Sequence, residues 1–138
     1  MYEQLKLSNQ LCFPLYAVSK EITRCYTPFL DKLDLTYPQY LAMLVLWEND
    51  AISVNQIGAR LYLDSGTLTP LLKRLQAKGL VERTRSQTDE RSVIIRLTEQ
   101  GKALEAQAAQ VPAQMANMLN LSEEEAATLH KIVAKLHR

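Results

Sequence analysis

Two short helical patterns in close succession, followed at once by two strand-like segments, constrain the fold of this chain more than any other feature. The first pattern opens at Ser53, with Gln56 three residues later in a capping-box arrangement. The second runs over residues 65–78 and precedes Gly79, a residue type that commonly follows the end of a helix. Two short helices joined by three or four residues are typical of a helix-turn-helix motif.

The segment after Gly79 has the pattern of a β-hairpin. Residues 80–85 and 92–97 favour strands, and the polar stretch 86–91 separates them. A hairpin that directly follows a helix-turn-helix is a wing. The sequence therefore predicts a mainly α-helical fold with a small β-hairpin wing, a winged helix-turn-helix of the α+β class.

Helical patterns also precede this unit. A helix is expected to begin between Gln10 and Phe13, because Pro14 is tolerated without a kink only in a first turn. A break is expected at Thr27-Pro28. The following helix, expected over 37–47, is apolar nearly all round and should be central and buried.

Two further helices are expected after the wing. One opens at Thr98-Glu99 and is kinked at Pro112, and the last opens with a capping box at Ser122. We expect one compact domain in three parts: sensor and dimerisation helices over 1–34, a winged helix-turn-helix over 35–98, and dimerisation helices over 99–138. The apolar stripes of the terminal helices either cover this chain's own core or pair with a second subunit, and we favour a homodimer.

Composition restricts the setting of the protein. The chain has no run of 18 apolar residues, and its first residues lack a basic region followed by an apolar one. We therefore expect a cytoplasmic protein without a membrane segment. The net charge is only +1, but residues 73–96 carry seven Lys and Arg against three Asp and Glu. Such a basic block favours a phosphate-contacting surface, although a solvated helix face is the alternative.

The winged helix-turn-helix suggests which side chains would touch double-stranded DNA. Short polar side chains at the start of the second helix suit base reading, and long cations beside them suit phosphates. Arg91, near the wing tip, suits a narrow minor groove, where Asp89 would orient it by a charge-assisted bond. The complete candidate set is Ser65, Thr67, Thr69, Lys73, Arg74, Arg83, Arg85, Asp89 and Arg91.

Cys12 is the candidate redox residue. The positive end of a helix and nearby hydrogen-bond donors both stabilise a thiolate, and Cys12 is expected at such a helix start. The alternative is that Cys12 is a buried small hydrophobic residue. If it is reactive, the apolar side chains of Phe13, Leu15, Tyr16 and Met43 would favour an organic hydroperoxide over hydrogen peroxide.

Four stretches of this sequence resemble one protein family over almost the whole chain. They are QLCFPLY at 10–16, LTYPQY at 35–40, LDSGTLTPLLKR at 63–74 and DER at 89–91. The chain resembles the MarR family of winged-helix regulators, and within it the organic hydroperoxide resistance repressors. The resemblance implies a triangular homodimer with the helix from Ser65 in the major groove and Arg91 in a minor groove.

The resemblance also implies a role for three tyrosines. It implies that the Cys12 thiolate is held by the hydroxyls of Tyr26 and Tyr37, which the partner subunit contributes. Tyr16 is expected to be a third aromatic residue of the same pocket. The expected function is a repressor that leaves a palindromic operator when an organic hydroperoxide oxidises Cys12 to a sulfenic acid.

The next oxidation step involves either a small cellular thiol or Cys25. The two cysteines lie 13 residues apart, roughly 20 Å along one helix, and a disulfide needs Cα atoms within ~7 Å. We therefore expect a small cellular thiol to cap Cys12, unless the helix breaks or the partner intervenes. No cofactor is expected, and His130 and His137 have no clustered ligands that would indicate a metal site.

Three other functions remain open at this stage. A thiol peroxidase using Cys12 is disfavoured because the sequence has neither a thioredoxin-like βαβ pattern nor a Cys-x-x-Cys motif. A sensor of small phenolic ligands would have the same fold, with Cys12 incidental. A broader redox-responsive regulator would share the surroundings of Cys12.

Overall fold

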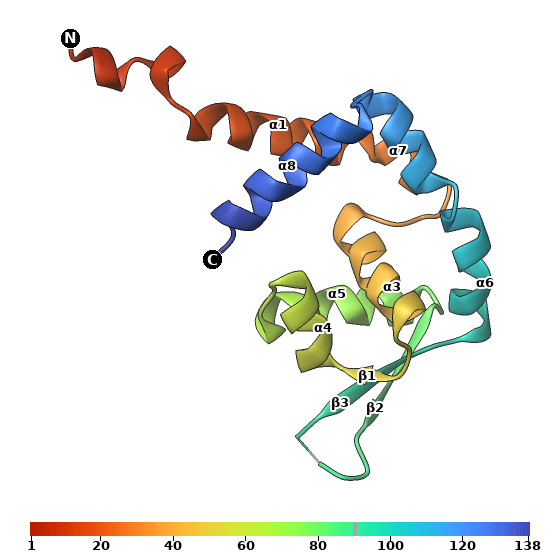
Figure 1. The fold of residues 1–138 in the computed structure, drawn as a ribbon. Coiled ribbons are helices and arrows are strands. Elements are labelled where there is room, and N and C mark those ends of the chain that lie inside the picture. Colours follow the sequence, from red (N-terminus) through yellow and green to blue (C-terminus); the bar gives the residue numbers. More distant parts are fainter. Residues whose placement is uncertain (90) are drawn as a thin grey trace.

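The computed structural model describes residues 1–89 and 91–138. Its helices are α1 (Cys12–Cys25), α2 (Thr27–Asp31), α3 (Tyr37–Glu48), α4 (Val54–Leu61), α5 (Ser65–Ala77), α6 (Glu99–Ala108), α7 (Val111–Leu119) and α8 (Glu123–Leu136). Its strands are β1 (Ile52–Ser53), β2 (Val81–Arg85) and β3 (Val93–Leu97), and two 3₁₀ turns, Glu3–Leu5 and Leu7–Asn9, precede α1. The predicted fold class, a helical protein with a winged helix-turn-helix, is confirmed (Figure 1).

Local sequence signals set the helix ends. At α4, the Ser53 hydroxyl accepts the Gln56 N–H at 3.1 Å, and the Gln56 side chain accepts the Ser53 N–H at 2.8 Å, which is the predicted capping box. The predicted box at Ser122 opens α8 in the same way. Gly79 has a φ of +79°, a conformation that favours glycine, just after α5 and its C-cap residue.

The sheet is small and antiparallel, with strand order β1-β3-β2. The β2–β3 hairpin is the predicted wing, and Val81 pairs with Leu97 at its base. Strand β1, which was not predicted, pairs Ile52 with Ile95 and so attaches the start of the helix-turn-helix to the wing.

The helix expected from residue 99 with a kink at Pro112 consists of two helices. α6 ends at Ala108, α7 begins at Val111, and Pro112 occupies the first turn of α7. A proline interrupts the hydrogen bond to the residue four positions earlier, so the break falls on the amino side of Pro112 rather than at it.

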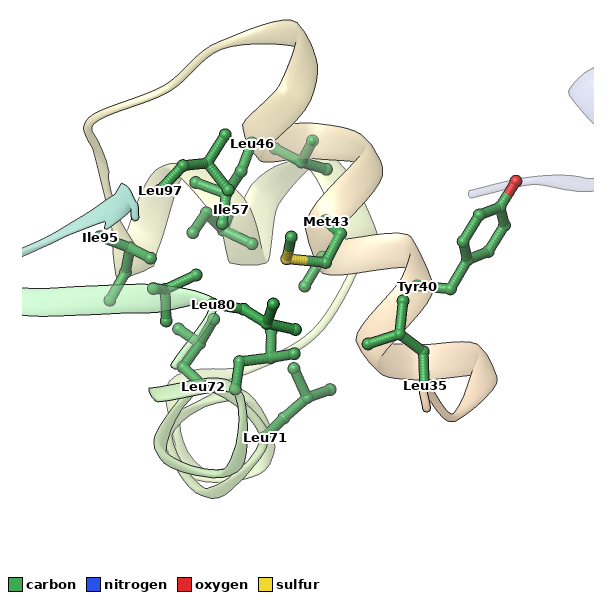
Figure 2. Packing of buried hydrophobic residues seen from close by; sticks show 14 of the residues in the cluster. Leu35, Tyr40, Met43, Leu46, Ile57, Leu71, Leu72, Leu80, Ile95 and Leu97 are labelled. Carbon is green, nitrogen blue, oxygen red and sulfur yellow. The ribbon is translucent and has the colours of Figure 1, made fainter. Parts of the chain in front are cut away.

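The core lies where α3 crosses the helix-turn-helix and the base of the wing. Met43 and Leu46 of α3 point toward Leu72 of α5, Ile57 of α4 and Ile95 of β3 (Figure 2). Because α3 is apolar nearly all round, it contacts α2, α4, α5 and α6, and it is central and buried as predicted.

The terminal helices contribute little to this core. Figure 1 shows the amino end of α1 and the preceding turns projecting from the body. Within the described chain, neither α1 nor α8 buries a residue. Their exposed large apolar side chains include Phe13, Leu15, Tyr16, Val18, Leu129, Ile132, Val133 and Leu136. Both helices thus present apolar surface that the protomer itself does not cover.

Residues 1–89 and 91–138 contain no helix that combines the length and the apolar character that a membrane span requires. That part of the chain also holds no group of three or more His, Cys, Asp and Glu side chains placed to bind a metal ion.

Candidate nucleic-acid interface and thiol site

The start of α5 presents short polar side chains on a firmly capped turn. Ser65 and Thr67 are exposed and Thr69 is half-buried. The Asp64 carboxylate accepts the Thr67 N–H at 2.7 Å, which holds the first turn in place. Hydrogen bonds from Thr67 and Gly66 hold the pKa of Asp64 below its usual value, so Asp64 is ionised at neutral pH. Sequence reasoning did not include this cap, although an Asp before a helix is a recognised signal.

Four of the predicted DNA-contacting residues line one hollow of about 220 Å³. Ser65 and Thr69 come from α5, Arg83 from β2, and Arg91 from the turn before β3. The remaining lining residues are Ser53, Val54, Asn55, Ser92 and Val93. The hollow therefore lies between the amino ends of α4 and α5 on one side and the wing on the other.

Arg83 has an incompletely satisfied guanidinium in this hollow. Its Nε atom is buried and has no hydrogen-bond partner among the described residues. A buried N–H without an acceptor is costly. The amino end of α4 lines the same hollow, and the amino end of a helix favours negative charge beside the two arginines. The hollow is thus suited to a phosphate group.

The wing turn is held by side chain–backbone bonds. The Asp89 carboxylate accepts the backbone N–H of Arg91 at 3.0 Å and the Ser92 hydroxyl at 3.4 Å. Asp89 was predicted to orient Arg91 by a charge-assisted bond, and the observed bond from the Arg91 N–H fixes the backbone of the turn, because an aspartate readily reaches the N–H two residues on. Glu90, the middle residue of the predicted motif, lies outside the described residues.

The other predicted cations stand on the same two elements. Lys73 and Arg74 are exposed on α5, and Arg85 is exposed at the end of β2. They lie near the lining residues in the sequence but do not line the hollow themselves. Their exposure suits contacts with phosphates.

Cys12 is the first residue of α1 and is exposed in the protomer. This is the predicted position at a helix amino end, and it excludes burial within the protomer's own core. Phe13, Leu15 and Tyr16 beside it are also exposed, whereas Met43 is fully buried in the core. The prediction that Met43 belongs to the same apolar surroundings is therefore wrong, because the inner face of α3 is used for core packing.

Cys25 is at the opposite end of α1. It is half-buried and packs against the hydrophobic core. α1 is continuous from Cys12 to Cys25, so the two sulfurs of one protomer are separated by roughly 20 Å along the axis. A bridge between them within one subunit would require α1 to unfold.

Tyr26 and Tyr37 form a cluster with Tyr40. The ring centroids of Tyr26 and Tyr37 are 4.7 Å apart, and Tyr40 lies 5.8 Å from Tyr26 and 6.3 Å from Tyr37. Burial raises the pKa of all three tyrosines, so their hydroxyls remain protonated at neutral pH and can donate hydrogen bonds. Tyr40 was not predicted as a member, because it falls on the apolar pattern of α3.

Tyr16 is not part of this cluster in the protomer. It is exposed near the start of α1, where the Lys20 Nζ lies 4.9 Å from its ring centroid. The cluster is at the far end of α1, next to Cys25. In one protomer, Cys12 therefore lies at the amino end of α1, whereas the Tyr26–Tyr37 pair lies beyond its carboxyl end.

Comparison with known proteins identifies the family. The family of transcriptional regulators SarA/Rot matches residues 24–107. An organic hydroperoxide resistance transcriptional regulator of Bacillus subtilis is 50% identical over 136 residues, which are 99% of this chain and 90% of that protein. A mutant MarR from E. coli, solved in complex with operator DNA, superposes with a TM-score of 0.85 at 30% identity, covering 93% of this chain and 94% of MarR. The chain belongs to the MarR family of winged-helix transcriptional regulators.

Within the MarR family the chain lies on the organic hydroperoxide resistance branch. Reduced AbfR bound to DNA is a further similar structure, with a TM-score of 0.81 and 38% identity over 96% of this chain and 92% of AbfR. The predicted family and its DNA-binding, transcription-regulating character are therefore confirmed.

Proposed function

We propose that this MarR-family protein is a homodimeric repressor that leaves its operator when an organic hydroperoxide oxidises Cys12. The observation that carries the proposal is the position of Cys12. It is exposed at the amino end of α1, a helix of which the protomer covers only the carboxyl end, at Ile22 and Cys25. A thiol there lies on the surface that a second subunit would cover, so a change at sulfur alters the contact between subunits.

The dimer is supported by the apolar faces of α1 and α8. Isolated exposed apolar residues are common on monomers, but two helices that each carry a row of them indicate a protein interface. Two-fold pairing also places two α5 helices on successive major grooves of a palindromic site. In such a dimer, the partner's tyrosine cluster is the proposed source of hydrogen bonds to the Cys12 thiolate.

The DNA contacts follow from the helix-turn-helix and the wing. Ser65, Thr67 and Thr69 are proposed to face base edges, and Arg91 a minor groove. The basic residues Lys73, Arg74, Arg83 and Arg85 are proposed to contact phosphates. Asp89 keeps the turn that presents Arg91.

The proposed chemistry has two balanced steps. The Cys12 thiolate attacks the terminal oxygen of the hydroperoxide, so an S–O bond forms, the O–O bond breaks and an alcohol leaves after protonation. A small cellular thiol then condenses with the sulfenic acid, which forms an S–S bond and releases water. The bulkier sulfur no longer accepts the tyrosine hydrogen bonds, and the subunits repack.

A gel-shift titration tests the function. Reduced wild-type protein is expected to retain a palindromic operator and to release it after treatment with cumene hydroperoxide and a small thiol. Cys12→Ser is expected to bind equally well and to stay bound after the same treatment, while Cys25→Ser responds like the wild type. Release of the operator by Cys12→Ser under peroxide would show that another residue is the sensor.

The phenolic-ligand alternative has its own structural support. A mainly apolar hollow of about 310 Å³ lies between α3 and the α6–α7 break and is lined by Tyr40, Leu44, Trp47, Pro112 and neighbouring residues. If this hollow takes a phenol, a phenolic ligand such as salicylate would release Cys12→Ser from the operator. The same titration, with salicylate in place of peroxide, distinguishes the two functions.

A further inference from the structure

Gln39 is a buried polar residue at the start of α3, and its side-chain oxygen accepts hydrogen bonds from two donors. Only 4% of its surface is exposed, and it is the polar side chain that the described chain buries. Its Oε1 accepts the Thr36 backbone N–H at 3.1 Å, and its own N–H donates to the Thr36 hydroxyl at 3.4 Å, which forms a capping box. The same Oε1 accepts a hydrogen bond from Lys78 Nζ at 3.1 Å.

Lys78 reaches this site from the other side of the core. It is the residue that follows α5, and its own N–H still bonds to the helix. Its Nζ also donates to the backbone carbonyl of Asp34 and lies 3.7 Å from the Asp34 carboxylate. The Asp34 side chain is 92% exposed, so this ion pair is weak. The specific contacts of Lys78 are its hydrogen bonds to the Asp34 carbonyl oxygen and to Gln39 Oε1.

This bridge joins the two ends of the proposed switch. Tyr37 is the first residue of α3, within the turn that Thr36 and Gln39 cap, and it contacts Tyr26 just beyond α1. Lys78 is at the carboxyl end of α5, the helix proposed to enter the major groove. The Lys78 side chain therefore connects, through its hydrogen bond to Gln39, the turn that carries Tyr37 to the helix proposed to read DNA.

We propose that Lys78 is a positioning residue that fastens the carboxyl end of α5 to the first turn of α3, so that a displacement of Tyr37 also displaces the recognition helix. The inference rests on the proposed function, because Cys12 oxidation is what would displace Tyr37.

The apolar contacts between α3 and α5 do not provide the same constraint. Leu71, Leu72 and Leu75 of α5 pack on α3 through side chains without directional bonds, and such packed helices can slide by small shear movements. The amide oxygen of Gln39 is different, because it has a fixed direction and is buried where water cannot replace a lost donor. Lys78 thus limits the sliding at the end of α5 nearest Tyr37.

The test compares operator affinity before and after oxidation in the full-length dimer. Lys78→Met keeps most of the aliphatic stem and removes the donor. In the reduced state its operator Kd is expected to stay within about twofold of the wild type, because Lys78 is not among the proposed DNA contacts. The ratio of the oxidised to the reduced Kd is expected to fall by about fivefold or more, the lower range of allosteric coupling.

Conservative variants separate positioning from general stability. Lys78→Arg retains long-armed donors, and Gln39→Glu retains both the capping box and an acceptor for Lys78; both are expected to keep the wild-type ratio. Lys102→Met, which removes an exposed lysine that pairs with Glu99 on α6, is the matched control and is expected to change nothing. Circular dichroism melts of the same samples show whether each variant is folded.

Two results would overturn the inference. One is a ratio of oxidised to reduced Kd in folded Lys78→Met that equals the wild-type ratio. If that variant does not fold, a lowered ratio in folded Lys78→Arg or Gln39→Glu has the same consequence. The other is a wild-type protein whose operator Kd ignores oxidation, which contradicts the proposed function and leaves Lys78 nothing to transmit. The wild-type lane of the experiment thus distinguishes the two failures.

Discussion

At the scale of single residues, Arg83 best illustrates how the structure prepares the protein for DNA. Its Nε is buried and has no partner among the described residues, and its side chain lines a hollow that also contains Arg91, Ser65 and Thr69. Two guanidinium groups and two hydroxyl groups around one hollow attract an anion. A phosphate of the DNA backbone has the charge and the oxygen geometry that this hollow requires.

Arg83→Gln is expected to weaken operator binding and to reduce its salt dependence. Losing one phosphate contact lowers the magnitude of the slope of log K against log salt by about 1. Arg96→Gln is the matched control, because Arg96 is exposed on β3 and does not line the hollow. Fluorescence anisotropy titrations over a range of KCl concentrations measure both slopes, and equal slopes for the two variants would contradict the assignment.

At the scale of elements, local signals predicted the helices well. Ser53 with Gln56, Ser122 with Glu125, and Gly79 after α5 each act within a few residues of the helix end that they set. The wing and the helix-turn-helix followed from the same kind of pattern. Cys12 was likewise placed at the start of α1 because Pro14 restricts where that helix begins.

The features that sequence did not predict depend on residues far apart in the chain. Strand β1 exists because Ile52 pairs with Ile95. The Lys78–Gln39 bond joins positions 39 residues apart. The burial of Met43 away from Cys12 follows from how α3 lies on α5, which the periodicity of α3 cannot show since nearly every face of it is apolar.

The junction of wing and α6 gives an element-scale prediction at Gly101. A Cβ added there would lie 2.1 Å from the Leu80 backbone oxygen, and the Gly101 carbonyl accepts the Trp47 indole N–H at 2.9 Å. Gly101→Ala must therefore displace α6 or the start of β2, and we expect a loss of about 1–3 kcal/mol in the free energy of unfolding.

Urea denaturation of Gly101→Ala measures this loss. Gly66→Ala is the control, because its added Cβ would come no closer than 3.4 Å to the Asp64 carboxylate. This substitution also replaces a glycine within helix α5. Its free energy of unfolding is expected to change by less than about 1 kcal/mol. Equal stabilities of Gly101→Ala and the wild type would show that α6 does not pack on Leu80 as closely as described.

At the scale of the whole molecule, the protomer separates a well-packed reading unit from uncovered terminal helices. The core extends from Leu30 to Met115, and neither α1 nor α8 contributes a fully buried residue to it (Figure 1). Pairing of these helices would set the spacing of the two α5 helices, so a change near Cys12 would alter that spacing. A shift of a few ångströms would then break the register with successive major grooves.

Native mass spectrometry of the protein–operator complex measures stoichiometry, sulfur state and DNA occupancy together. The account predicts that reduced protein appears as two chains per duplex. After cumene hydroperoxide and a small thiol, dimers that carry the added thiol mass on both Cys12 residues should be found free of DNA, and reductant should restore the complex. DNA-bound dimers with both Cys12 residues modified, present at the level of the reduced complex, would contradict it.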